Sequence, residues 1–209
     1  AASSAASIPP GPPPMTTIFF NRTGTTAGCS SMPMVGLMAQ RMGLDDAPWC
    51  TVQCVAASNA AVTARAGLRV LPDTGFAGTG NVSADILLVP GGVVDAPLDS
   101  PTTLAWIASQ AASAKVIASV CTGAFLLAAA GVITDERVTT HWEDIADLQQ
   151  AWPRLSVVGH VRWVDMGRVV TSAGISAGID MSLHLVERLG GQALAERTAR
   201  QMDFAWTRN

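Results

Sequence analysis

One cysteine stands at the junction between two segments of different character. Residues 116–120 form a short apolar run typical of a buried strand, and residues 122–130 are rich in Ala and Leu, as helices are. Cys121 lies between them, with the small residues Ser119 and Gly123 two positions to either side. This is the spacing of a nucleophile elbow, a sharp strand-to-helix turn that exposes a reactive side chain. A thiol there would attack an electrophilic carbon, and the helix start behind it would favour the thiolate.

Backbone amides near this cysteine are candidates for stabilising negative charge on a substrate. The N–H of Thr122 belongs to the turn itself, and Gly91 and Gly92 follow another apolar run, residues 86–89. Two converging sets of such donors form an oxyanion hole. The alternative for Cys121 is a buried structural thiol at the end of a strand, because free cysteines also behave as small hydrophobic residues in protein cores.

The elements that must position these residues alternate along the chain. We expect strands at residues 16–20, 50–56, 68–71, 86–89, 116–120, 155–158, 161–164 and 168–171, and helices at residues 32–42, 101–114, 122–130, 143–151, 176–189 and 193–204. This alternation predicts an α/β fold, a doubly wound and mainly parallel sheet with helices on both faces. Ligands of such folds bind at the carboxyl ends of the strands, where Cys121 would lie.

Composition narrows the class of protein. The chain has 209 residues, of which 49% are hydrophobic and 14% charged, and its net charge is -3. These values exclude a disordered polyampholyte, and the lack of clustered Lys and Arg disfavours nucleic acid as a partner. No apolar run reaches the roughly 20 residues that span a bilayer, so no membrane is expected as a partner and a cytoplasmic location is expected. The cysteine spacing predicts neither a disulfide scaffold nor a metal site.

Residues 1–14 differ from the rest of the chain, because they consist mainly of small residues and prolines. Such a segment has little apolar surface to bury, so we expect a disordered leader over 1–14 and one domain over 15–209.

Four motifs carry a resemblance to a known family. They are ILLVPGG at 86–92, ASVCTGAFLLAAAGVI at 118–133, TTHW at 139–142 and VVTSAGISAGIDMSLHLV at 169–186. In this order they resemble the DJ-1/PfpI (ThiJ) superfamily over about residues 50–206. Within it they are most similar to the isonitrile hydratases and to the amidotransferase-like sensor domains of AraC-type regulators. The Cys-Thr-Gly sequence at Cys121 is the form carried by that branch, whereas the PfpI proteases place a histidine after the cysteine.

The resemblance implies a flavodoxin-like fold, a small-molecule substrate and a homodimer, without a metal or an organic cofactor. It implies that Cys121 attacks the terminal carbon of an isonitrile and that the resulting thioimidate is hydrolysed to an N-substituted formamide. Thr122, Gly91 and Gly92 would supply the backbone donors. Ile175 and Ser176 would lie near the thiol. The alternatives are a non-catalytic domain that senses or binds a small molecule, and another activity of the superfamily, namely glyoxalase-like or deglycase-like chemistry or redox sensing.

One departure from the family pattern concerns proton transfer. The resemblance implies an Asp or Glu in the loop after the first strand, but the first acidic residue of this chain is Asp45. If Pro33 matches the proline of the family, Gly28 or Cys29 takes the place of the acid, so Cys29 is a candidate for lining the pocket, with a plain loop or core thiol as the alternative. His141 is a second pocket candidate, with capping of the helix that follows it as the alternative.

Overall fold

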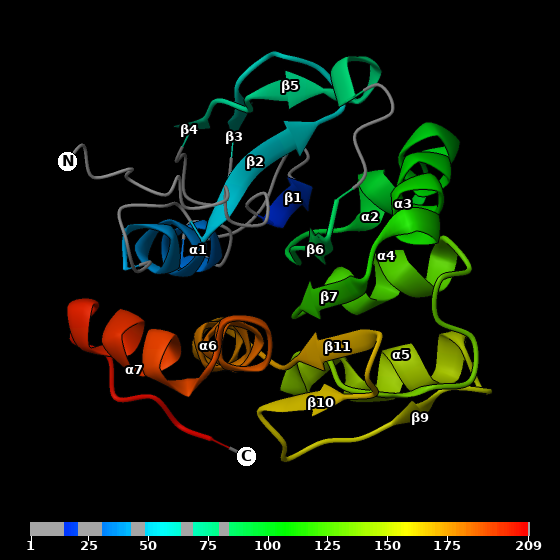
Figure 1. Ribbon diagram of the computed structural model, residues 1–209. Helices are drawn as coiled ribbons and strands as arrows, with labels where there is room; N and C mark the ends of the chain where they lie inside the picture. The colour runs from blue at the N-terminus through cyan, green and yellow to red at the C-terminus, as the bar shows by residue number, and fades with distance from the viewer. Residues whose placement is uncertain (1–14, 21–30, 43–48, 64–68, 80–83, 209) are drawn as a thin grey trace, which may run out of the picture.

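The computed structural model describes residues 15–20, 31–42, 49–63, 69–79 and 84–208. The expected leader at 1–14 and Cys29 lie outside these residues. In the described part of the chain a seven-stranded sheet has the order β10-β11-β7-β6-β1-β2-β5 (Figure 1). Its strands are β1 (Met15–Phe20), β2 (Cys50–Ala56), β5 (Thr74–Gly75), β6 (Ile86–Val89), β7 (Val116–Val120), β10 (Trp163–Asp165) and β11 (Val169–Ser172). Neighbouring strands are parallel except at the β10–β11 pair, which is antiparallel.

Helices cover both faces of this sheet (Figure 1). One face carries α1 (Ser31–Arg41), α6 (Ile175–Gly190) and α7 (Gln192–Gln201), and the other carries α2 (Asp95–Leu98), α3 (Pro101–Ser113), α4 (Gly123–Ala129) and α5 (Ile145–Ala151). Strand β6 shows why both faces need to be covered, because its successive side chains point to opposite faces and pack into two separate cores. Ile86 and Leu88 pack with Met181 of α6, whereas Leu87 and Val89 pack with residues of α3 and α4. A strand buried on both faces reads as a continuous apolar run.

The expected fold class is confirmed, and β2, β6 and β7 have the expected bounds. The expected helix over 143–151 is wrong at its start, since a 3-10 turn, η3 (Trp142–Asp144), precedes α5. Four two-residue strands form two small pairs beside the main sheet. They are β3 (Val62–Thr63) with β4 (Arg69–Val70), and β8 (Arg137–Val138) with β9 (Ser156–Val157). A turn at η2 (Phe76–Thr79) completes the described elements. Elements of two residues are too short to carry a hydrophobic period.

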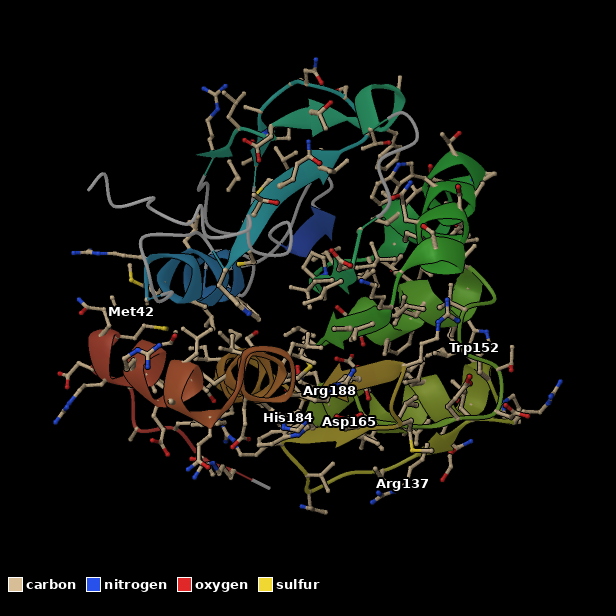
Figure 2. The ribbon with its side chains drawn as sticks, in the orientation of Figure 1. Met42, Arg137, Trp152, Asp165, His184 and Arg188 are labelled. Atoms are coloured by element: carbon tan, nitrogen blue, oxygen red, sulfur yellow. The ribbon has the colours of Figure 1, made fainter. Side chains whose placement is uncertain are left out.

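A polar cluster joins the edge strand β10 to helix α6. The Asp165 carboxylate lies 2.7 Å from Nε2 of His184 and accepts hydrogen bonds of 2.9 Å from Arg188 (Figure 2). The ring of His184 also stacks on Trp163. His184 is therefore a partnered packing residue. Among the described residues, no helix is long and apolar enough to cross a membrane.

Candidate active site

Cys121 sits in a strained turn between β7 and α4. Its φ of 56° lies in the left-handed region, which L-residues other than glycine seldom adopt. Two neighbouring segments hold this backbone. The Cys121 N–H donates to the carbonyls of Ser172 and Ala173, each at 3.0 Å, and the Thr140 hydroxyl donates to the Cys121 carbonyl at 2.9 Å. The surrounding structure thus fixes the conformation that a nucleophile elbow requires.

Two glycines allow the loop after β6 to meet the elbow backbone to backbone. A Cβ placed on Gly91 would lie 2.5 Å from the Thr122 nitrogen and 2.6 Å from the Val120 oxygen. A Cβ placed on Gly123 would overlap the carbonyl oxygen of Val89. Because β6 and β7 are parallel neighbours, their carboxyl ends meet at this edge of the sheet. Gly91 and Gly123 therefore leave the space in which the loop after β6 contacts the Cys121 turn.

Thr122 links the elbow to the Gly91–Gly92 loop through its side chain. Its hydroxyl accepts from the Gly92 N–H at 2.6 Å and donates to the Gly92 carbonyl at 2.7 Å. The Gly92 amide, which the sequence suggests as a donor to substrate, is thus bonded within the protein in this structure. Substrate would have to replace the Thr122 hydroxyl to use that amide.

The electrostatic environment of the Cys121 thiol combines opposing effects. Burial raises the pKa of Cys121, whereas hydrogen bonds from the Thr122 amide and hydroxyl lower it, and the charges of Asp144 and Glu143 raise it further. The pKa ends above its ordinary value, so the resting group at neutral pH is a thiol. The expectation that the helix start would favour the thiolate is wrong for the net effect, because desolvation outweighs the donors at the turn.

His141 takes the second of its two predicted roles, the capping of the segment that follows it, and its role in lining a pocket stays a prediction. Its Nδ1 accepts a hydrogen bond of 3.4 Å from the Glu143 N–H and so caps η3. The same nitrogen lies 3.6 Å from Oδ2 of Asp144 and 3.6 Å from Oε2 of Glu143. The opposite edge of the ring lies against Gly174, where a Cβ would be 3.1 Å from Cδ2. The ring therefore lies beside the residues that hold the Cys121 backbone.

The remaining predicted residues lie at the start of α6, directly after the Ala173–Gly174 segment. The side chain of Ile175 is 51% exposed, and the hydroxyl of Ser176 accepts a hydrogen bond of 3.4 Å from Arg162. Cys29 lies outside the described residues. The other predicted site residues follow the carboxyl ends of β6, β7 and β11 or belong to the His141 segment, and the expectation that Ile175 and Ser176 lie near the thiol stays a prediction.

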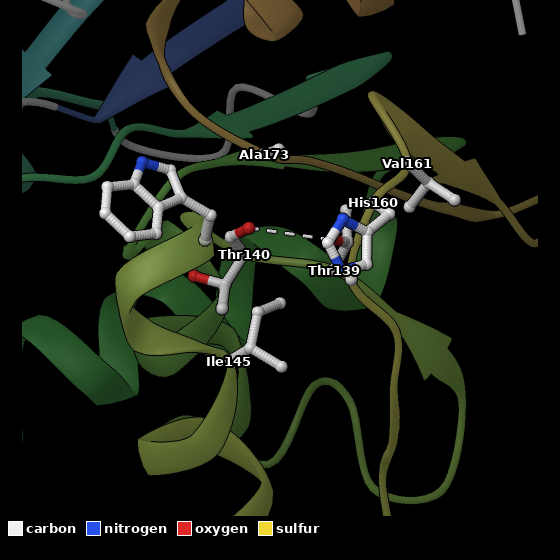
Figure 3. Close-up of a pocket in the computed structure, with 8 residues that line it drawn as sticks. Thr139, Thr140, Ile145, His160, Val161 and Ala173 are labelled. Carbon is white, nitrogen blue, oxygen red and sulfur yellow. Dashed lines mark hydrogen bonds between the residues drawn. The ribbon is translucent and has the colours of Figure 1, made fainter.

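A pocket of about 330 Å³ adjoins the elbow (Figure 3). Its lining comprises Thr139, Thr140, Trp142, Ile145, Gly159, His160, Val161 and Ala173. Thr140 and Ala173 both bond to the backbone of Cys121, so this pocket shares a wall with the nucleophile turn. Four of these lining residues are not among the site residues predicted from the sequence, namely Trp142, Ile145, His160 and Val161. The TTHW motif, which contains Trp142, is the sequence feature that could have indicated this pocket.

A doubly wound α/β fold with a cysteine in a left-handed turn at the carboxyl edge of its sheet defines the class of this protein. A sequence model of the DJ-1/PfpI family matches residues 40–188. The chain belongs to the DJ-1/PfpI family.

Individual relatives within this family differ in function. The chain is 39% identical over 145 residues to isonitrile hydratase of Pseudomonas putida, a match that covers 69% of this chain and 61% of that protein. It is 34% identical over 149 residues to the HTH-type transcriptional regulator GbdR of Pseudomonas aeruginosa, covering 71% of this chain and 40% of the regulator. The structure of Drosophila melanogaster DJ-1beta, 20% identical, superposes with a TM-score of 0.77 over 92% of this chain and 100% of that one.

Proposed function

We propose that this protein is a cysteine-dependent hydratase of the isonitrile hydratase type, with Cys121 as its nucleophile. The left-handed Cys121 turn, with Thr122 bonded to the Gly91–Gly92 loop, is the observation that carries the proposal. The 39% identity to the Pseudomonas putida hydratase supports it, although the chain spans only 61% of that relative. The proposal includes the single domain over 15–209, the homodimer and the cytoplasmic location that the sequence analysis expects.

The reaction adds one water molecule to the isonitrile. The sulfur of Cys121 forms a bond to the terminal carbon while that carbon takes up the thiol proton, which gives a thioimidate. Water then adds to the same carbon, and a proton moves to the nitrogen. When the carbon–sulfur bond breaks, the N-substituted formamide leaves and the thiol is restored. In this proposal the Thr122 amide, which lowers the pKa of Cys121, also stabilises the charge that develops during these steps.

The pocket beside the elbow suits the organic substituent of such a substrate. The side chains of Trp142, Ile145 and Val161 give it an apolar wall. Small-molecule sites are typically apolar concavities with a few polar groups that fix orientation.

Assay of an alkyl isonitrile tests this function. The wild-type protein and Cys121→Ala are incubated with tert-butyl isonitrile, and the formamide proton is followed by NMR. Cys54→Ala is the control, because that half-buried thiol lies on β2, which β6 and β1 separate from β7 in the sheet. Formamide should appear with wild type and with Cys54→Ala and be absent with Cys121→Ala. Turnover that survives in Cys121→Ala, or no turnover by the wild type, contradicts the proposal.

A sensing domain without catalysis is the second candidate function. The raised pKa of Cys121 and the internal bond of the Gly92 amide favour it, because both describe a site at rest rather than one poised to react. One relative, GbdR, is an HTH-type transcriptional regulator. A ligand that raises the melting temperature of wild type and of Cys121→Ala equally, without product, would establish this candidate.

A further inference from the structure

The peptide group that joins Cys121 to Thr122 is hydrogen-bonded at both of its polar groups. Burial raises the pKa of the Cys121 thiol, and a hydrogen bond from the N–H of this peptide group, which belongs to Thr122, lowers it. The carbonyl of the same group, which belongs to Cys121, accepts a hydrogen bond of 2.9 Å from the Thr140 hydroxyl. Because a peptide group is planar, a contact that fixes the direction of its carbonyl also fixes the direction of its N–H.

The Thr140 hydroxyl is the closer of two donors to this carbonyl. The other is the N–H of Ala124 in α4, which lies 3.4 Å from the Cys121 oxygen. Thr140 has no exposed surface, so water does not compete for its hydroxyl. Without that hydroxyl, the carbonyl would keep only the longer and weaker hydrogen bond.

The segment that carries Thr140 is itself anchored beside the sheet. The N–H of Thr139 donates to the hydroxyl of Thr171 in β11 at 2.8 Å. The Thr139 hydroxyl donates to the Val158 carbonyl, also at 2.8 Å. A donor on an anchored segment holds its acceptor in one direction, so the Thr140 hydroxyl can orient the Cys121 carbonyl.

The conformation held in this way is one that the Cys121 backbone does not prefer. A φ of 56° is unfavourable for a residue with a side chain, and such a backbone persists only where the surrounding contacts over-determine it. Removal of the Thr140 hydroxyl would therefore allow the peptide group to rotate. The Thr122 N–H would then point away from the sulfur for part of the time.

We propose that Thr140 is a positioning residue of the active site, which acts through the Cys121–Thr122 peptide group to orient the Thr122 N–H toward the reacting sulfur and carbon. That N–H is the donor for the charge that develops during hydration, so the inference rests on the proposed function. A hydrogen bond at the carbonyl also polarises the peptide group and strengthens its N–H as a donor. Both effects stabilise negative charge on the sulfur.

The pH dependence of Cys121 alkylation tests this role. The rate at which iodoacetamide alkylates the Cys121 peptide is measured by mass spectrometry at a series of pH values. Thr140→Val removes the hydroxyl and keeps the shape of the side chain, and the charges of Asp144 and Glu143 act on the thiol as before. We expect the profile to move to higher pH and the rate at pH 7 to fall about tenfold, the equivalent of one pKa unit. The two rates should converge at high pH, because both proteins then carry the thiolate.

Two further variants separate positioning from a general loss of stability. Thr140→Ser keeps the hydroxyl and should retain the wild-type profile. Thr198→Val is the matched control, because Thr198 is equally buried and its hydroxyl donates to the Leu194 carbonyl of α7 at 2.8 Å. This control should lower the melting temperature and leave the profile unchanged. Circular dichroism melts verify folding, and Thr140→Ala, which also lacks the hydroxyl, replaces Thr140→Val if that variant is unfolded.

Isonitrile kinetics give a second readout. Thr140 lines the pocket beside the elbow, and valine preserves the shape of that wall. Thr140→Val should therefore keep the KM for tert-butyl isonitrile and lower kcat, which is the result expected when an interaction made in the transition state is weakened.

An unchanged or lower pKa of alkylation in Thr140→Val overturns the inference, as does an equal shift in Thr140→Ser or Thr198→Val. A raised KM with an unchanged kcat in Thr140→Val also overturns it. The alkylation assay uses no isonitrile, so its result is separate from that of the hydratase assay. A shifted profile without formamide from wild type would support the positioning role and reject the hydratase. Formamide from wild type with an unchanged profile would support the hydratase and reject the positioning role.

Discussion

At the scale of single residues, Thr122 has two roles, one through its amide and one through its hydroxyl. The Cys-Thr-Gly sequence predicts that its amide belongs to the turn. The structure adds a side-chain role, because the hydroxyl bonds to both polar groups of Gly92 and lowers the pKa of Cys121 when its one proton turns from the Gly92 carbonyl to the sulfur. Those partners are 30 residues apart along the chain, so the sequence gives no local pattern for this contact.

Substitution of Thr122 should separate these two roles. Thr122→Val removes the hydroxyl but keeps the shape, so the pKa of Cys121 rises and its alkylation at pH 7 slows by about tenfold, as expected for loss of a hydrogen bond to a charged group. Thr122→Ser keeps the hydroxyl and should retain the wild-type rate. Equal rates in Thr122→Val and wild type would show that the hydroxyl does not act on the thiol.

At the scale of the elements, the elbow depends on the close approach of β6, β7 and the loops that follow them. Sequence reasoning located these strands, because continuous apolar runs bounded by Pro, Gly or Cys leave few other interpretations. It did not separate η3 from α5, since His141 starts the turn with a side-chain bond that a hydrophobic pattern does not reveal. One strand of each small pair, β4 or β9, lies within a predicted strand, whereas β3 and β8 are not predicted, because two residues define no period.

Glycine substitution tests the packing of these elements. Gly123→Ala would press a Cβ against the Val89 carbonyl, and we expect it to lower the free energy of unfolding by about 1–3 kcal/mol. Gly159→Ala is the control, because a Cβ there meets nothing within 4 Å, and its effect should stay within about 0.5 kcal/mol. Urea unfolding measures both. Equal stabilities of the two variants would contradict the close contact at Gly123.

At the scale of the whole molecule, the cluster at Asp165 connects the edge of the sheet to α6. Burial raises the pKa of Asp165, but hydrogen bonds from His184, Gly167 and Arg188 outweigh it and hold the pKa below its ordinary value. A carboxyl group with a lowered pKa in the folded state stabilises the protein above its unfolded pKa. That stabilisation is lost as the pH falls through the folded-state pKa.

Acid unfolding should report this cluster. Between pH 6 and pH 3 the wild type is expected to lose more stability than Asp165→Asn, with most of the loss below the ordinary aspartate pKa of about 3.9. Urea denaturation at a series of pH values measures the difference. Asp147→Asn, which removes an exposed carboxylate, should follow the wild-type curve. Parallel curves for wild type and Asp165→Asn would mean that the cluster does not contribute to stability.

The left-handed backbone of Cys121 determines how substitutions at this position change the stability of the protein. Glycine adopts a φ of 56° without steric penalty, whereas a residue with a side chain loses about 1–2 kcal/mol there. Cys121→Gly should therefore melt at a higher temperature than Cys121→Ala, although neither retains the thiol. At this position a cysteine supplies the reactive thiol, whereas a glycine would make the fold more stable. A descendant of this chain that no longer needed the thiol would become more stable by replacing it with glycine.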